Sequence, residues 1–286
     1  MTQTDASRSG AGLSAPADPA VTVELARTER DAREAVAALA EVWPRDDGAL
    51  PLPPELAWAF AHSGNYVALA RRGDRVVGAA VGFRGADDSG PVLHSHIAGV
   101  LAGSQSLGVG YRLKQHQRAW ALAAGLDRIT WTFDPLVARN GYFNVVKLGA
   151  ELTHYYVDFY GRMDDGINAG DETDRCLVTW RLSSARATRA ADGVFVTADV
   201  DAARSRGAAE VLRRDRGGAP EVRADAAALR LVQVPPDVVD LRHREPQLAT
   251  AWRHALREAL VAAFADGLEV VGVGRDGWYV LERPAA

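Results

Sequence analysis

Apolar and polar residues alternate with two different periods along the chain. Residues 29–43 carry apolar side chains at Ala32, Val36, Leu39 and Val42, the spacing of a helix that buries one face. A short apolar strand at 21–26 precedes it, and a second short helix at 55–64 follows the proline-rich break PRDDGALPLPP. Residues 66–85 read as two strands joined at Gly73-Asp74, which is a hairpin signal.

The same patterns continue to residue 182. They predict a strand at 91–100, a helix at 111–124, a strand at 128–134, a helix at 138–150, and strands at 151–160 and 175–182. The resulting order is strand, helix, helix, three strands, helix, strand, helix and two strands. This order predicts an α/β domain with one mixed central sheet over residues 21–182.

A second block follows a linker predicted at 183–192. Residues 193–286 predict a smaller C-terminal α/β lobe, with a helix at 201–214, a strand at 229–235, a helix at 246–267 and strands at 268–274 and 278–284. Trp252, Leu256, Leu260 and Phe264 share one face of the long helix, so this face needs a partner surface. Residues 1–20, rich in Ser, Ala, Gly and Pro, predict a disordered tail.

Composition narrows the class of protein. The chain has 286 residues, of which 48% are hydrophobic and 24% charged, which is typical of a soluble globular protein. No apolar run is long enough to cross a bilayer and no secretory h-region is present, so we expect a cytoplasmic protein without a membrane partner. A net charge of −4 and the lack of a basic stripe argue against nucleic-acid binding. The single cysteine, Cys176, excludes an intramolecular disulfide and argues against a cysteine-based zinc site.

A glycine-rich stretch, GSQSLGVGYRLKQHQRAW, joins the strand at 91–100 to the following helix. Glycines there are consistent with a tight corner and nothing more. They are also typical of an anion site, because unpaired N–H groups at a helix start favour a phosphate. A dinucleotide-binding motif is a poorer match, because G-x-G occurs once and the third glycine is missing.

The stretch QSLGVG, together with ITWTFDPLVARNGYFNVVKLGA further on, resembles the GNAT superfamily of acyl-CoA-dependent N-acetyltransferases. Its signature at this junction is Gln/Arg-x-x-Gly-x-Gly/Ala. The resemblance covers residues 21–182, and the C-terminal extension resembles only an uncharacterised branch of the superfamily. It implies the GNAT fold and a loop that holds the pyrophosphate of acetyl-CoA. The implied coenzyme-binding residues are Val100, Gln105, Ser106, Leu107, Gly108, Val109, Gly110, Tyr111, Asn140 and Asn144.

The fourth strand lacks the carboxylate that serves as base in many GNAT enzymes. It offers His94 and His96 instead, two residues apart and therefore on one face. A histidine is a reasonable base near neutral pH, although each also fits a structural, hydrogen-bonded role. A metal site is not expected, because no carboxylate or third histidine lies nearby in the sequence.

The acid that usually protonates the leaving thiolate in this superfamily is a tyrosine on the fourth helix, and Val145 occupies its place here. Tyr142, one turn earlier, is a substitute candidate, with core packing as the alternative. Asp134, at the end of the strand at 128–134, is a candidate for binding the acceptor amine or orienting a histidine. An Asp before Pro is equally typical of a turn.

The resemblance thus predicts transfer of an acetyl group from acetyl-CoA to the amine of a small molecule, by direct attack in a ternary complex and without a metal. Two alternatives stay open. One is a non-catalytic acyl-CoA-binding or sensing protein, because the acid and base positions are unconventional. The other is a protein that binds a partner through the C-terminal lobe, which is also the candidate surface for a homodimer.

Overall fold

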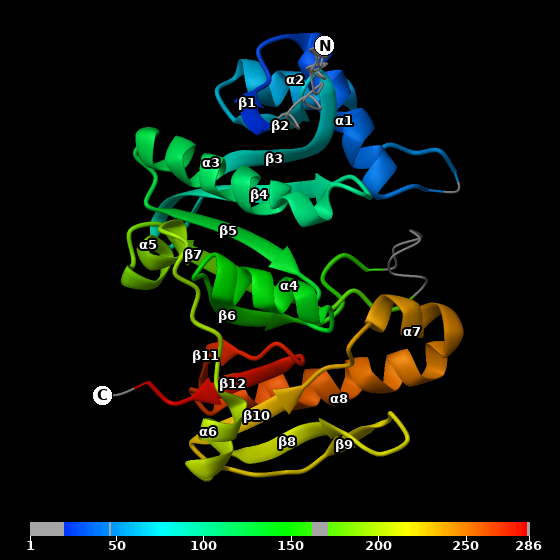
Figure 1. Cartoon of the computed structure of the whole chain (residues 1–286), viewed down its shortest axis with the longest axis vertical. Coiled ribbons are helices and arrows are strands. Elements are labelled where there is room, and N and C mark those ends of the chain that lie inside the picture. Colours follow the sequence, from blue (N-terminus) through cyan, green and yellow to red (C-terminus); the bar gives the residue numbers. More distant parts are fainter. Residues whose placement is uncertain (1–19, 46, 162–170, 285–286) are drawn as a thin grey trace, which may run out of the picture.

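Two β-sheets organise the chain. The computed structural model describes residues 20–45, 47–161 and 171–284. Seven strands form a mixed sheet in the order β1-β2-β3-β4-β5-β7-β6, and five strands form a second sheet in the order β11-β12-β10-β8-β9 (Figure 1). The predicted fold class, an α/β fold with one mixed central sheet and a smaller C-terminal α/β lobe, is confirmed. The disordered tail predicted at the N-terminus lies outside the described residues.

The larger sheet follows the predicted order of elements. Its strands are β1 (Val21–Leu25), β2 (Tyr66–Arg72), β3 (Arg75–Asp87), β4 (Gly90–Val100), β5 (Arg128–Phe133), β6 (Glu151–Tyr156) and β7 (Arg175–Arg181). Its helices are α1 (Glu29–Val42), α2 (Pro54–His62), α3 (Val109–Ala123) and α4 (Ala138–Tyr142). The hairpin between β2 and β3 turns at Gly73, whose φ is 60°. The predicted ends of these helices and strands therefore agree with the structure to within a few residues.

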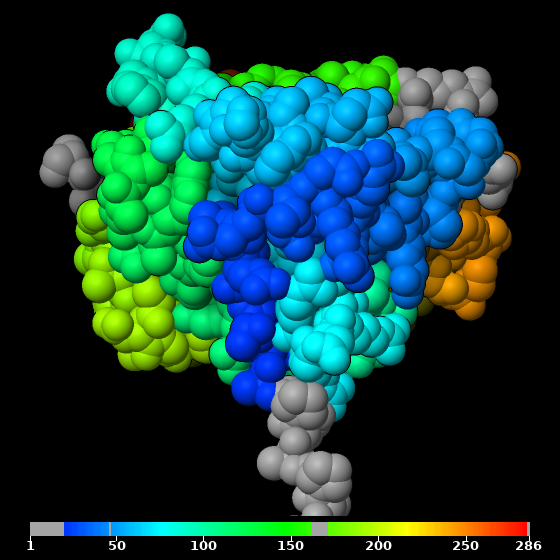
Figure 2. Space-filling view, turned by 90° about the horizontal axis from the view of Figure 1, so that it is seen from above, coloured from blue at the N-terminus to red at the C-terminus, as the bar shows by residue number. Residues whose placement is uncertain are grey.

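Helices cover both faces of this sheet. Val67 and Leu69 of β2 pack with α1 and α2, whereas the intervening Ala68 packs with α3. Successive residues of a strand point to opposite faces, so α1 and α2 lie on one face and α3 on the other. In Figure 2 the blue elements β1, α1 and α2 cover much of the face seen from above.

The predicted helix at 138–150 changes its winding midway. It begins as α4 and continues as a π-helical turn over Phe143–Lys147. The Leu148 N–H donates to the Phe143 carbonyl five residues back, at 3.1 Å. Such turns add one residue to a helical turn and often occur at functional sites, and this one lies beside the cavity described below.

The smaller sheet departs further from prediction. The predicted helix at 201–214 is wrong. Helix α6 (Val200–Ser205) ends two residues before Gly207, whose φ is 84°, and the chain then forms β8 (Ala209–Arg214). Parallel pairing with β10 (Leu229–Gln233) outweighs the helix propensity of this alanine-rich segment. The predicted linker contains a short helix, α5 (Ala185–Ala191), because Ser184 caps it by accepting the Ala187 N–H.

The remaining elements are β9 (Pro220–Val222), α7 (Val238–Arg244), α8 (Pro246–Ala265), β11 (Glu269–Val273) and β12 (Trp278–Glu282). Of these, β9 and α7 were not predicted from the sequence. The β9 strand has only three residues and α7 only seven, too few for a clear hydrophobic period.

Helix α8 lies between the two sheets (Figure 1). Trp252, Leu256 and Leu260 are fully buried, and Phe264 is partly buried against the same core. Burial of one such side chain stabilises a fold by about 1.5–3 kcal/mol. The apolar face of α8 is therefore covered within the chain, so it is not the exposed patch that a partner-binding role required.

A cluster of buried charges joins α7 and α8 to the end of β5. Arg242 and Arg253 both bind Asp134 and Asp171. Two carboxylates thus meet two guanidinium groups in a buried, bidentate arrangement. Within the described part of the chain, no helix is long and apolar enough to span a membrane.

Candidate active site

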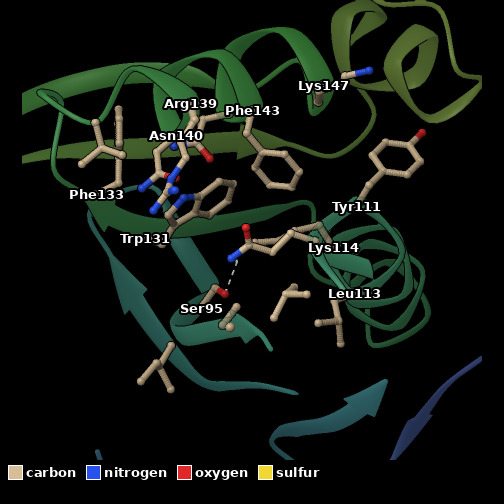
Figure 3. Close-up of a pocket in the computed structure, with 18 of the residues that line it drawn as sticks. Ser95, Tyr111, Leu113, Lys114, Trp131, Phe133, Arg139, Asn140, Phe143 and Lys147 are labelled. Atoms are coloured by element: carbon tan, nitrogen blue, oxygen red, sulfur yellow. Dashed lines mark hydrogen bonds between the residues drawn. The ribbon is translucent and has the colours of Figure 1, made fainter. Parts of the chain in front are cut away.

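A cavity opens where β4 and β5 separate. These parallel strands pair only at Leu93 with Ile129 and at His94 with Thr130. Beyond these pairs, the strands diverge, and residues from Ser95 to Val100 and from Trp131 to Phe133 line a cavity of about 900 Å³. Its other walls come from α3, from α4 and from the π-helical turn after it (Figure 3). The glycine-rich loop, Val42, Trp43, Phe195 and Val239 complete the lining. A crevice at the carboxyl ends of parallel strands is a common place for a ligand.

The glycine-rich loop forms one end of the cavity. It makes a 3₁₀ turn over Gln105–Leu107, and Gly108, with φ at 69°, precedes α3. No side chain caps α3, and the Arg112 N–H is the first to donate back, to the Gly108 carbonyl at 3.0 Å. The earlier N–H groups of the helix are left without intrahelical partners. A Cβ on Gly108 would meet no atom within 4 Å, so the loop faces open space.

The cavity has no acidic lining residue among those that the structure describes, and three of its lining residues are cationic: Lys114, Arg139 and Lys147. At its mouth, Lys147 Nζ lies 3.7 Å from the centre of the Phe195 ring, and Tyr111 packs edge-on against the same ring. Phe195 belongs to the segment that leads into the smaller sheet. The open N–H groups and the three cations together suit an elongated polyanion.

A β-bulge shapes the middle of the cavity. Between the pairs Val81–Ile97 and Phe83–His94, β3 advances by two residues and β4 by three. The extra residue of β4 falls at Ser95–His96, and such a bulge re-aims side chains. The rings of His94 and His96 lie 6.5 Å apart, and both contact Phe83. The two histidines therefore lie together, as expected from their spacing.

The two histidines nevertheless differ in their surroundings. His96 is the more exposed of the two and lines the cavity, whereas His94 is half-buried and lies 3.4 Å from Thr130 Oγ1. Burial lowers the pKa of His94 to about 4, with smaller contributions from His96 and Lys114, and burial also lowers the pKa of His96. Phe83 also packs on Phe60 of α2, so both rings face the side of the sheet that carries α1 and α2.

A lysine occupies the vertex where the strands part. Lys114 Nζ donates to Ser95 Oγ at 2.8 Å (Figure 3) and also to Gln117 Oε1 at 3.1 Å. It also lies 3.7 Å from the centre of the Trp131 ring. The side chain is buried, no carboxylate pairs with it among the described residues, and burial lowers its pKa to about 7.

The structure brings most of the predicted coenzyme residues to the cavity wall. Those that line it are Val100, Gln105, Gly108, Gly110, Tyr111, Asn140 and Asn144. Ser106, Leu107 and Val109 do not line it, and Val109 is buried in the core instead. Of the predicted catalytic residues, only His96 lines the cavity; His94 lies behind it.

Asp134 and Tyr142 lie away from the cavity lining. Asp134 is held by Arg242 and Arg253, and the Tyr142 hydroxyl shares a 2.9 Å hydrogen bond with Thr197 Oγ1. Burial alone would raise the pKa of Asp134, but the two guanidinium groups lower it to about 2. Both side chains contact the C-terminal lobe, which favours a structural role for each.

Sequence reasoning missed Lys114, Ser95 and Trp131, which meet at the vertex. One signal was available: Leu113, Gln117 and Ala121 form the buried stripe of α3, and Lys114 falls on it. A lysine on the buried stripe of the helix after a phosphate loop is unusual, because lysine is almost never fully buried. Its contacts with Ser95 and Trp131 depend on the fold, so the sequence alone does not reveal them.

Comparison with protein-family models identifies the class. Residues 29–143 match the family described as Acetyltransferase (GNAT) family. The chain therefore contains a GNAT acetyltransferase domain, as the loop motif predicted. The matched residues include β4, β5, α3 and the glycine-rich loop, which contribute most of the residues that line the cavity.

Several solved structures are similar to this chain over part of its length. The Naa50 structure from Arabidopsis thaliana, in complex with a bisubstrate analogue, is 18% identical, with a TM-score of 0.44 over 56% of this chain and 97% of that one. A GNAT-family acetyltransferase from Streptococcus pneumoniae is 18% identical, with a TM-score of 0.45 over 56% and 98%. YncA from Salmonella typhimurium, a putative acetyltransferase with acetyl-CoA, is 15% identical, with a TM-score of 0.45 over 57% and 95%. A comparison with curated proteins finds no match.

Proposed function

We propose that this protein transfers an acetyl group from acetyl-CoA to the amine of a small molecule, by direct attack in a ternary complex. The observation that carries the proposal is one continuous cavity. It connects the open N–H groups before α3 with His96, Ser95 and Lys114 at the point where β4 and β5 part. This arrangement combines a phosphate-binding end with titratable groups near the middle of the sheet.

The residues present fit the coenzyme. The N–H groups of Gly110 and Tyr111 would hold the pyrophosphate at the positive end of α3. Gly110 keeps the wall open there, because a Cβ on it would lie 3.7 Å from Val100 and 3.9 Å from Phe143. Lys147 at the mouth would add positive charge near the phosphates, and Asn144 would offer an amide to the pantetheine.

When bound, acetyl-CoA supplies an acetyl group activated as a thioester. His96 takes a proton from the attacking amine, on the face of the sheet that carries α1 and α2. Burial lowers the pKa of His96, which favours the neutral imidazole that can accept a proton. His94 supports the position of His96 through their shared contact with Phe83.

The shape and charge of the cavity support a small acceptor. The indole ring of Trp43 closes against Gly99, where a Cβ would lie 2.7 Å from the ring. Trp43 and Val42 thereby wall the cavity on the α1 side and leave limited space for a folded substrate. The cationic lining disfavours polycationic amines and favours a neutral or acidic small molecule that carries one reactive amine.

A thiol-release assay tests the proposal. The purified protein is incubated with acetyl-CoA and a panel of small amines, amino acids and N-terminal peptides, and free coenzyme A thiol is measured. We expect turnover with a small amine and none with the peptides. Turnover with peptides alone would overturn the small-molecule assignment while leaving the acetyltransferase activity standing.

A specific observation favours one alternative, a protein that binds acetyl-CoA without catalysis. Val145 stands where the superfamily usually has an acidic tyrosine, and the fourth strand has no carboxylate. A protein that binds acetyl-CoA without turning it over would share these features. Saturable binding of acetyl-CoA together with no thiol release from any amine would favour this sensing role.

A further inference from the structure

The lysine at the vertex of the two strands has no role in the reaction as described so far. We propose that Lys114 donates the proton that the sulfur of coenzyme A needs as it leaves, in place of the tyrosine that Val145 replaces. This inference rests on the proposed acetyl transfer and adds a second catalytic residue to it. Four observations support it: the place of Lys114 in the cavity, the face of the sheet on which it lies, the groups that contact its ammonium, and its acidity.

The position is the vertex of the cavity. Ser95 and Trp131 are the first residues beyond the last β4–β5 pairs, and Lys114 Nζ contacts both. A ligand that enters between the strands from the glycine-rich loop must end near this vertex, because the paired strands close the sheet beyond it. The reactive end of the ligand is therefore the part that reaches Lys114.

The face of the sheet separates Lys114 from the histidines. Lys114 rises from α3, whereas His94 and His96 face α2 through Phe83. Alternating residues of β4 explain this division, since Leu93 packs in the core with α3 while His94 packs on Phe83. Titratable groups on both faces of the sheet suit an acetyl transfer in which the amine approaches from the side of the histidines and the sulfur departs on the side of Lys114.

Two contacts stabilise the ammonium form of Lys114, which is the form that can donate a proton. Gln117 Oε1 accepts from Nζ, and the Trp131 ring attracts its positive charge. On β4, His94 feels the charge of Lys114. Trp131 of β5 and Gln117 of α3 contact the ammonium group directly, and Lys147 of the π-helical turn lies at the mouth against Phe195. No carboxylate pairs with Lys114 within the described residues, so nothing locks its proton in an ion pair.

The acidity matches the task. Burial lowers the pKa of Lys114 to about 7, whereas the thiol of a cysteine side chain has a pKa of about 8.5. Transfer of a proton from the ammonium group to a departing thiolate is therefore downhill. In the balanced step, the N–C bond forms and the C–S bond breaks. His96 accepts one proton from the amine, Lys114 gives one to sulfur, and both return to their starting forms by exchange with water.

The first test needs no turnover. The chain has only two lysines, Lys114 and Lys147, so lysine labelled with ¹³C at Cε gives two side-chain signals, and K147R assigns them. We expect the Lys114 signal to titrate near pH 7 and to shift more with coenzyme A than with desulfo-coenzyme A. Equal shifts with the two ligands would place the sulfur elsewhere and overturn the proposal.

The second test uses K114M and K114R. Calorimetric titration should show that both bind coenzyme A within a few-fold of wild type, while kcat with acetyl-CoA falls by about 100-fold or more. Arginine keeps the charge but cannot donate its proton at these pH values. Wild-type kcat in K114M, or full activity in K114R, would exclude proton donation by Lys114.

A change of leaving group separates chemistry from structure. 4-Nitrophenyl thioacetate releases a more acidic thiol, which needs no proton to leave. With this donor we expect the rate of K114M to approach the rate of wild type. An equal deficit with both donors would identify a structural role and overturn the proposal. If the wild-type protein does not bind coenzyme A, the proposed function fails as well. If the wild-type protein binds coenzyme A and K114M keeps wild-type activity, only the role of Lys114 is refuted.

Discussion

Arg253 of α8 holds both carboxylate oxygens of Asp134 at the end of β5, with Nη1–Oδ1 at 3.2 Å and Nη2–Oδ2 at 2.9 Å. The same guanidinium group binds Asp171 at 2.9 Å. Because Asp134 follows the last residue of β5, this contact fixes the strand that forms one wall of the cavity to the C-terminal lobe. The lobe therefore supports the site without lining most of it.

Replacement of Arg253 by Met should destabilise the fold strongly. It would leave two buried carboxylates with one cation fewer, and breaking a buried ion pair typically costs about 3–5 kcal/mol. The free energy of unfolding in urea measures this effect. Arg244 provides a matched control, because its ion pair with Asp240 is exposed, and R244M should change the stability by less than about 1 kcal/mol. Similar small losses in both variants would contradict a stabilising cluster.

The Asp134 cluster should also make stability depend on acid. Its two arginines lower the pKa of Asp134 in the folded state to about 2, below the value of about 3.9 in an unfolded chain. The stabilisation is therefore complete above pH 4 and is lost as the pH falls towards 2. Urea unfolding between pH 2 and 5 should show a shallower pH dependence for D134N than for wild type. An unchanged slope would show that this carboxylate does not titrate as described.

His96 should determine the acidic limb of the activity. Its lowered pKa means that kcat/KM for acetyl-CoA, which reports the free enzyme, should rise with pH at values below the ordinary histidine pKa of about 6.5. The proposed acid Lys114, whose pKa burial lowers to about 7, should give a falling limb at higher pH. In H96Q we expect the value to fall by about 100-fold and the rising limb to disappear. H94Q, whose ring lies behind His96, should retain the limb; its loss in H94Q alone would move the role of base to His94.

Gly141 should be intolerant of a larger side chain, because a Cβ there would lie 2.3 Å from the Tyr279 hydroxyl of β12. That hydroxyl donates to the Pro135 carbonyl at 2.8 Å, so it has little freedom to move away. G141A should lower stability by about 1–3 kcal/mol and weaken coenzyme binding by displacing Phe143 and Asn144. G85A, where a Cβ would meet nothing within 4 Å, is the control, and equal melting temperatures for the two variants would contradict this packing.

The sequence predicts the larger sheet well because its elements have strong periods and clear breaks. Ala32, Val36 and Leu39 reveal α1, and Gly73 marks the hairpin. The smaller sheet is harder, since β8 pairs with a strand some twenty residues away and its own composition favours a helix. Pairing between distant segments carries no local signal.

The same limit applies to the site. The glycine-rich loop is one contiguous motif, so its position at the start of α3 was predictable. The vertex is not contiguous: Ser95, Lys114 and Trp131 come from three elements, and only the divergence of β4 from β5 brings them together. Asp134 illustrates the converse, because its arginine partners lie more than a hundred residues further along the chain.

The most direct test of the account is calorimetric titration of acetyl-CoA into the wild-type protein and into G110L. Gly110 lines the cavity on α3 between Val100 and Phe143, so a leucine side chain there would occupy the space assigned to the coenzyme. A119L, which places the same side chain at an exposed position of α3, is the control. The account predicts saturable binding to wild type and A119L and none to G110L. Equal binding to all three, or no binding to wild type, would contradict it.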